Sequence, residues 1–231
     1  EVFTGWYKSE KLFYFENFRN EIHPDAITFS KALGGGKSSI SCVVVNDDLY
    51  NLAYGRLSET FLHTTTYNGF GEESATAIEA INILASDEFK NKAKKLANYM
   101  RKKLEEIKNK HPEKIQEVRG TGILNGIIFK SFSSELSKIF EKVPLKLIND
   151  KAFFLKKLTA TAISSELYEN HNILVAVSDS SNSNHLSMIP PLIINENEID
   201  NFFNSLDVVL NKGVKLKSIE IILNFIKSKI K

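Results

Sequence analysis

The chain has 231 residues, of which 42% are hydrophobic and 25% are charged, so it has enough apolar material for a substantial core. Thirty basic residues against 28 acidic ones leave a formal net charge of +2, which is too balanced to indicate a nucleic-acid-binding protein. The single cysteine, Cys42, excludes an internal disulfide framework and favours a reducing compartment. No signal peptide is recognisable, and no apolar run approaches the ~18–20 residues of a membrane span, so we expect a cytoplasmic protein.

The first half of the chain carries two short predicted strands. Residues 1–5, EVFTG, are expected to end a strand and enter a turn, and residues 11–18, KLFYFENF, are aromatic and either helical or extended. β-Branched and apolar residues alternate in 25–30, DAITFS, which predicts a short strand. The nearly continuous apolar run in 40–47, ISCVVVND, is typical of a strand buried on both faces. Cys42 lies in this run, so we expect a buried core thiol rather than a nucleophile.

Helices and strands alternate from about residue 72 onward, as in an α+β domain. Residues 72–89 have apolar side chains at helical spacing behind an acidic first turn. Residues 91–112 continue as a long charged helix that ends at a His-Pro pair. Residues 115–130 predict two strands joined by a turn at Gly120 and Gly122.

Further helical and extended segments complete the chain. A less regular helical stretch at about 134–170 precedes a strand at 173–179 and another at 185–195, which a proline pair interrupts. Residues 196–213 predict a helix with a glycine at its end. Residues 214–231 predict a basic amphipathic helix that packs on the protein or binds a partner, rather than one that lies on a membrane surface.

A lysine followed closely by glycines marks the first candidate site. Lys31 comes directly after the predicted strand at 25–30, and Gly34, Gly35 and Gly36 follow it in SKALGGG. Glycines let the backbone approach a ligand closely, and a lysine amine can form a Schiff base with a carbonyl cofactor. On this stretch alone, a solvated lysine beside a flexible loop is the more frequent arrangement.

A threonine-rich segment supplies the second candidate. Residues 61–75, FLHTTTYNGFGEESA, place Thr65 and Thr66 before a glycine turn at a helix entrance. Hydroxyls and free backbone N–H groups at such an entrance can bind a phosphate, although the segment alone is also compatible with an ordinary strand end. A Schiff-base lysine and a phosphate site are together the two features by which a protein holds pyridoxal phosphate (PLP).

The order of these segments resembles the class III (ω-)aminotransferases, which are PLP-dependent enzymes of fold type I. The opening EVFTGWYKSEKLFYFE is similar to a family block with an acidic pair, Val, Thr-Gly and Lys-Leu-Phe. PDAITFSKALGGG resembles the family's cofactor-lysine block nearly residue for residue, and HTTTYNGFGEESATAIEAINIL resembles its phosphate-threonine block. VRGTGILNGI and IPPLIINENEID resemble small-domain blocks, so the resemblance covers about residues 1–210.

The resemblance implies roles for individual residues. Lys31 would hold PLP as a Schiff base and then move a proton between the substrate carbon and the cofactor. Thr66, with Thr65 beside it, would bind the cofactor phosphate, in this family usually from the neighbouring subunit, which implies a homodimer with its active site at the interface. Val2 would pack against one face of the pyridine ring. The family's aspartate that pairs with the pyridine nitrogen would lie just before Glu1, outside these 231 residues.

Two further residues bear on the substrate. Ser187 stands where many relatives have an arginine, and a serine cannot pair bidentately with a substrate carboxylate. We therefore expect a substrate that lacks an α-carboxylate at this subsite, or one whose carboxylate is recognised elsewhere. Trp6 is a candidate for lining the substrate pocket, although a place in the aromatic core is the default for such a residue.

The five histidines show no ligand spacing, so we predict no metal site.

These assignments predict an α/β protein with the PLP-dependent transferase (aspartate aminotransferase-like) fold. Residues 1–80 would be the C-terminal part of the PLP-binding large domain, 81–210 the α+β small domain, and 211–231 a basic helical extension. The expected activity is transfer of an amino group between an amine or amino acid and a keto acid or aldehyde through Lys31, and it would need the family's N-terminal half. The alternatives are an aminomutase or racemase of the same fold, or a non-catalytic interaction module.

Overall fold

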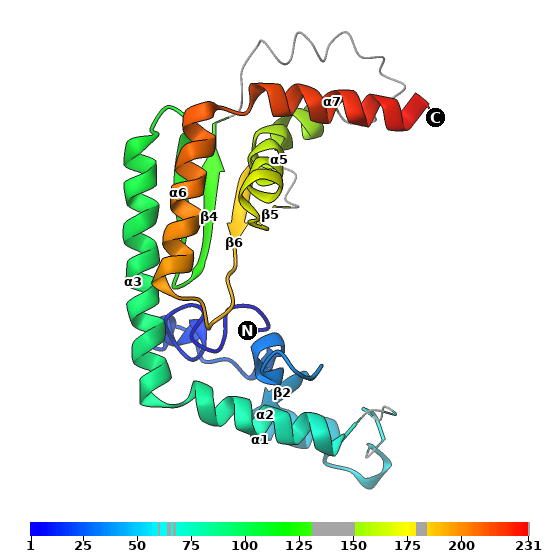
Figure 1. The fold of residues 1–231 in the computed structure, drawn as a ribbon. Helices are drawn as coiled ribbons and strands as arrows, with labels where there is room; N and C mark the ends of the chain where they lie inside the picture. Colours follow the sequence, from blue (N-terminus) through cyan, green and yellow to red (C-terminus); the bar gives the residue numbers. More distant parts are fainter. Residues whose placement is uncertain (60, 64–65, 67, 131–150, 179–183, 231) are drawn as a thin grey trace. The chain divides into compact units, whose positions relative to one another are not determined.

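The chain forms two compact units in the computed structural model (Figure 1). The first unit comprises Glu1–Lys95 and the second Leu96–Lys231. The domain boundaries expected near residues 80 and 210 stay predictions. The structure describes residues 1–59, 61–63, 66, 68–130, 151–178 and 184–230.

The first unit contains one small antiparallel sheet. β1 (Ala26–Phe29) pairs with β2 (Cys42–Val45), so both strands predicted here are confirmed. The aromatic segment includes a short 3₁₀ helix, η1 (Tyr14–Phe18), whereas residues 2–9 form turns rather than the expected strand end. The other helical segments of this unit are η2 (Lys31–Gly34), α1 (Asp47–Tyr54), η3 (Leu57–Glu59) and α2 (Gly71–Leu84).

The sequence patterns did not predict α1. Its N-cap is Asn46, whose side-chain oxygen accepts a hydrogen bond from the backbone N–H of Leu49 at 2.8 Å. Asp47 and Asp48 occupy the first turn, where the helix dipole favours negative charge. The Asn-Asp pair that ends β2 therefore also begins a helix, because the same residue types that stop a strand are good helix caps.

β2 is largely exposed, so the predictions of a strand buried on both faces and of a buried thiol at Cys42 are wrong. Cys42 is an exposed free cysteine, and Val43 is 60% exposed. The physical reason is that β2 pairs only with β1 in the part of the chain that the structure describes. An apolar run shows that a strand can be buried, but only neighbouring layers bury it.

Close packing supports the turn after β1. Gly35 follows η2 with φ = 57°, and a Cβ placed there would lie 3.3 Å from the Cβ of Ala80 on α2. Glycine at this position therefore serves both the left-handed backbone and the close approach of a helix.

Elsewhere in the same unit, the ring of Trp6 packs edge-on against Phe13 and Phe29, with centroid separations of 5.7 and 5.6 Å.

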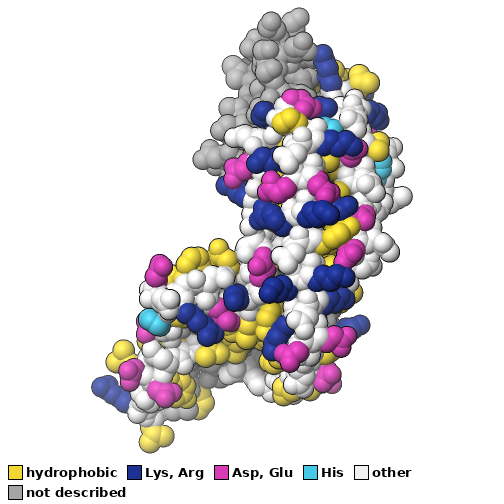
Figure 2. All heavy atoms as spheres, turned by 90° about the vertical axis from the view of Figure 1, so that its left-hand side faces the viewer, with side chains coloured by type: hydrophobic (Ala, Val, Ile, Leu, Met, Phe, Trp, Pro, Cys, Tyr) yellow, Lys and Arg dark blue, Asp and Glu magenta, His cyan; other side chains and the backbone are white. Residues whose placement is uncertain are grey.

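The long charged helix is confirmed as α3 (Asp87–Lys110). It is a separate helix from α2, which ends at Leu84, whereas the sequence pattern predicted a continuous one. Acidic and basic side chains are interspersed along its outward face (Figure 2), and Arg101 pairs with Glu105 at 3.9 Å one turn later. Such pairs between exposed side chains contribute only a few tenths of a kcal/mol, roughly, so this face is mainly a solvated surface.

The second unit is built on a four-stranded antiparallel sheet. The strands β3 (Ile115–Thr121), β4 (Leu124–Phe129), β5 (Ala176–Val177) and β6 (His185–Met188) lie in the order β3-β4-β6-β5. The predicted strand–turn–strand is confirmed, with Gly122 in the turn at φ = 57°. Gly120 lies within β3 at φ = 140°, where a Cβ would collide with the carbonyl oxygen of Leu124.

The helices that complete the second unit are α5 (Lys151–His171), α6 (Glu196–Lys212) and α7 (Lys215–Ile230), together with the C-terminal part of α3. α5 contacts β4, β5 and β6 of the sheet, and α6 and α7 pack against α5. Figure 1 shows α6 running alongside α3. The predicted helix at 134–170 is confirmed from Lys151 onward, and its first part lies outside the described residues. The fully buried side chains of this core include Met100, Leu104, Ile127, Ile163, Leu167, Leu186 and Leu206.

Local signals explain both ends of α6. The backbone N–H of Glu198 donates to the Asn195 side chain, and the Glu198 carboxylate accepts the N–H of Asn195, which closes a capping box at the start of α6. Gly213 follows α6, as predicted. α7 confirms the predicted C-terminal helix, and it packs against α5 through a face that includes the buried Ile222.

Candidate active site

Lys31 lies at the start of η2, separated from the end of β1 by Ser30, and its side chain is exposed. Its backbone has φ = 49°, in the left-handed region that residues with a side chain seldom occupy. The preceding Ser30 donates a hydrogen bond from Oγ to the carbonyl oxygen of Ile40 at 2.7 Å, which closes the loop that contains Lys31. Strained backbone that neighbouring contacts hold in place is concentrated at functional sites.

A pocket of about 350 Å³ opens beside Lys31. Its lining residues are Ser30, Lys31, Ser38, Ser39, Ile40 and Ser41. The Oγ atom of Ser38 is buried and has no hydrogen-bond partner among the residues that the structure describes. An amine and several hydroxyls around one cavity suit a small polar ligand that carries a carbonyl group and further oxygen atoms.

Phe3 and Lys8 lie near Lys31, although they are not among the pocket-lining residues and sequence reasoning did not identify them. The Nζ atoms of Lys8 and Lys31 each lie 5.5 Å from the centroid of the Phe3 ring. Burial, and secondarily the charge of Lys31, holds the pKa of the Lys8 ammonium below its usual value. Both missed residues belong to the opening turns, and no local spacing in the sequence shows that these turns fold back toward Lys31.

The other residues predicted for the first unit do not line this pocket. Val2 and Thr66 are exposed, and Thr66 lies in a turn before α2. Thr65 lies outside the described residues. Trp6 is only 5% exposed, within the aromatic cluster. Their roles toward a cofactor or substrate stay predictions, and for Thr66 the expected site was that of a neighbouring subunit.

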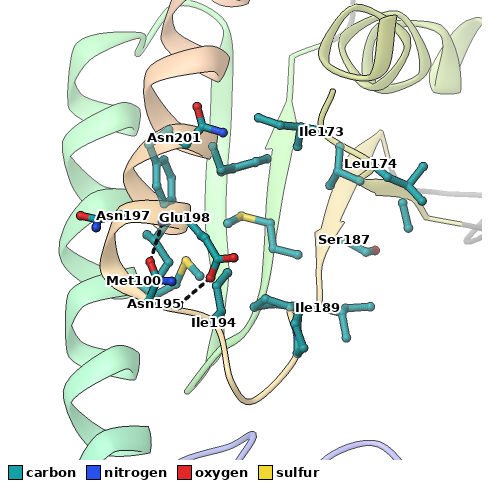
Figure 3. Close-up of a pocket in the computed structure, with 18 of the residues that line it drawn as sticks. Met100, Ile173, Leu174, Ser187, Ile189, Ile194, Asn195, Asn197, Glu198 and Asn201 are labelled. Carbon is teal, nitrogen blue, oxygen red and sulfur yellow. Dashed lines mark hydrogen bonds between the residues drawn. The ribbon is translucent and has the colours of Figure 1, made fainter. Parts of the chain in front are cut away.

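Ser187 lies in the second unit on β6, paired with Gly126 of β4 and Ala176 of β5. It is one of the residues that line a pocket of about 700 Å³, to which β5, β6 and the start of α6 contribute (Figure 3). The lining is mostly apolar and includes Ile173 and Ile189. The pocket is large enough for a substrate-sized group, and the substrate role of Ser187 stays a prediction.

The described part of the chain holds no group of three or more His, Cys, Asp or Glu residues placed to bind a metal ion. None of its helices is both long enough and apolar enough to cross a membrane.

Solved structures with a similar fold are transaminases. A transaminase from the marine bacterium Virgibacillus has a TM-score of 0.74 and 23% identity, over 96% of this chain and 45% of its own. An ornithine aminotransferase from Plasmodium yoelii has a TM-score of 0.66 and 25% identity, over 90% of this chain and 46% of its own. The chain therefore has the fold of the PLP-dependent transaminases of fold type I, as predicted.

The sequence defines the family more narrowly. The family model "Aminotransferase class-III" matches residues 1–210, so the chain belongs to the class-III aminotransferases, which confirms the predicted family. An uncharacterised aminotransferase of Schizosaccharomyces pombe is 26% identical over 212 residues, which are 92% of this chain and 40% of that protein. The chain thus spans less than half the length of these relatives.

Proposed function

We propose that this protein acts as a PLP-dependent aminotransferase in which Lys31 binds the cofactor aldehyde. The observation that carries the proposal is a lysine with a left-handed backbone beside a hydroxyl-lined pocket, in a chain of the class-III family. When bound, PLP supplies an electron sink and carries the amino group from donor to acceptor. The substrates would be an amine or amino acid and a keto acid or aldehyde.

The residues around Lys31 fit such a cofactor. The buried, unpaired hydroxyl of Ser38 is available to a cofactor oxygen. Apart from its chain neighbours, no described residue lies within 4 Å of a Cβ placed at Gly36, so the glycine turn leaves open space. Thr66 would bind the phosphate at the site of a neighbouring subunit, so a homodimer is part of the proposal. A cytoplasmic location is proposed separately, from the single cysteine, which favours a reducing compartment.

Lys31 has a second task in this proposal. Once the substrate amine has displaced it, the free amine at Nζ is the base that takes a proton from the substrate carbon and later returns a proton as an acid. The Phe3 ring, whose centroid lies 5.5 Å from Nζ, would stabilise the resulting ammonium through its π electrons. Ser187 offers no cation to a carboxylate, so the subsite around it would accept a group without one.

Borohydride capture of PLP on the full chain tests the proposal. After incubation with PLP and reduction, peptide mass spectrometry should locate the cofactor on Lys31 in preference to Lys37, an exposed lysine of the same loop. Lys31→Ala should remove that label and leave labelling elsewhere unchanged, whereas Lys37→Ala should leave the Lys31 label intact. Equal labelling of the two lysines in the wild-type chain would refute the assignment of Lys31.

A further inference from the structure

Lys8 is a second ammonium group beside the candidate cofactor lysine. Its Nζ and that of Lys31 each lie 5.5 Å from the centroid of the Phe3 ring, so the two nitrogens are at most twice that distance, 11 Å, apart. A backbone hydrogen bond of 3.0 Å from Tyr7 N–H to the Lys11 carbonyl closes a turn around Lys8. The turn therefore holds this side chain near Lys31 independently of any ligand.

Among the residues that the structure describes, neither of the two ammonium groups forms an ion pair with a carboxylate. Lys8 is half-buried, and a desolvated charge is unfavourable unless a partner of opposite sign compensates it. The cation–π contact with Phe3 offsets the desolvation of Lys8 only partly, because two cations share one ring. An anionic group bound near both nitrogens would offset the desolvation of Lys8 and the repulsion between the two ammonium groups.

Amino-acid and keto-acid substrates bring such an anion to this place. In a transamination, the substrate nitrogen replaces the Lys31 nitrogen at the cofactor, so a carboxylate a few bonds away comes close to Lys8. We propose that Lys8 binds the substrate carboxylate at the Lys31 site, an inference that rests on the proposed function.

Matched amines test this inference through binding rather than turnover. The full chain is loaded with PLP, titrated with β-alanine or propylamine, and then reduced with borohydride. These two amines differ by a carboxylate in place of a methyl group. An amine that displaces Lys31 protects it from labelling, so the concentration that gives half-protection measures the binding of that amine. In the wild-type chain, β-alanine should protect at a lower concentration than propylamine.

Variants at Lys8 provide the decisive comparison. Lys8→Met should raise the half-protection concentration of β-alanine about tenfold or more, the factor expected for a lost charge-assisted hydrogen bond, and should leave propylamine unchanged. Lys8→Arg should retain most of the preference for β-alanine. Lys11→Met, which changes an exposed lysine of the same turn, should retain all of it. If circular dichroism shows that Lys8→Met is misfolded, Lys8→Gln replaces it in the comparison.

The possible failures are distinguishable. The inference is overturned if the wild-type chain shows no preference for β-alanine, or if protection is unchanged in Lys8→Met. In either case the assignment of Lys31 as the cofactor lysine is unaffected. A Lys8→Met chain that needs more PLP to label Lys31 but, once labelled, keeps the full preference for β-alanine assigns Lys8 to cofactor binding and also overturns the inference. A wild-type chain without selective labelling of Lys31 overturns the proposed function, and the inference fails with it.

Discussion

Asp207 on α6 anchors the end of α3, so removal of its carboxylate should destabilise the second unit. It accepts hydrogen bonds from His111 Nε2 at 2.7 Å and from Lys110 Nζ at 2.7 Å. The His111 side chain is 4% exposed and that of Lys110 is 60% exposed. An exposed ion pair contributes ~0.2–1 kcal/mol, whereas a buried donor left unpaired costs ~1–3 kcal/mol. We therefore expect Asp207→Ala to lower the free energy of unfolding by about 1–4 kcal/mol, mostly through His111.

The same carboxylate should make stability depend on pH. The hydrogen bonds from Lys110 and then from His111 hold the pKa of Asp207 below its ordinary value of 3.8. A carboxyl group whose pKa is lower in the folded state stabilises the fold above its unfolded-state pKa, and this stabilisation is lost as the pH falls through the folded-state pKa. The difference in unfolding free energy between wild type and Asp207→Asn should thus be full at neutral pH and shrink below pH 3.8.

Urea unfolding followed by far-ultraviolet circular dichroism measures these differences. The matched control is Glu105→Ala, which removes a half-exposed carboxylate from the α3 surface, where its ion pair with Arg101 spans 3.9 Å. This control should change the free energy of unfolding by less than about 0.5 kcal/mol. An Asp207→Ala variant no less stable than Glu105→Ala would refute the reasoning. So would a difference between wild type and Asp207→Asn that stays constant below pH 3.8.

Two further pairs of variants test the packing of each unit. Gly35→Ala and Gly36→Ala both force alanine into a left-handed backbone, at a cost of ~1–2 kcal/mol. Gly35→Ala should destabilise the first unit more, because only the methyl group at 35 meets Ala80, at 3.3 Å. Fluorescence of the single tryptophan during urea unfolding measures both losses, and equal losses would contradict the contact. Leu206→Ala, at a fully buried position, should cost about 2–5 kcal/mol, whereas Leu216→Ala, at a position 82% exposed, should change stability by less than ~0.5 kcal/mol. Circular dichroism during unfolding compares the two, and similar losses would place Leu206 outside the core.

Contiguous signals allowed the sequence alone to predict much of the fold. The strand at 25–30, Lys31 and the following glycines are neighbours in the chain, so their pattern is readable without any knowledge of tertiary contacts. The ends of α6 were predictable for the same reason, because Gly213 stops the helix through interactions within a few residues. The family was also predictable, because its blocks occur in order along residues 1–210.

Only the tertiary structure decided which residues are buried and which meet Lys31. The apolar run around Cys42 is compatible with burial, but the strand is exposed because it has β1 as its one described neighbour. Phe3 and Lys8 meet Lys31 because the opening turns fold back toward η2, and spacing rules for helices and strands describe only contacts between near neighbours. The sequence by itself therefore identified Lys31 as the candidate cofactor lysine, and the fold of the opening turns decided that a second ammonium group lies near it.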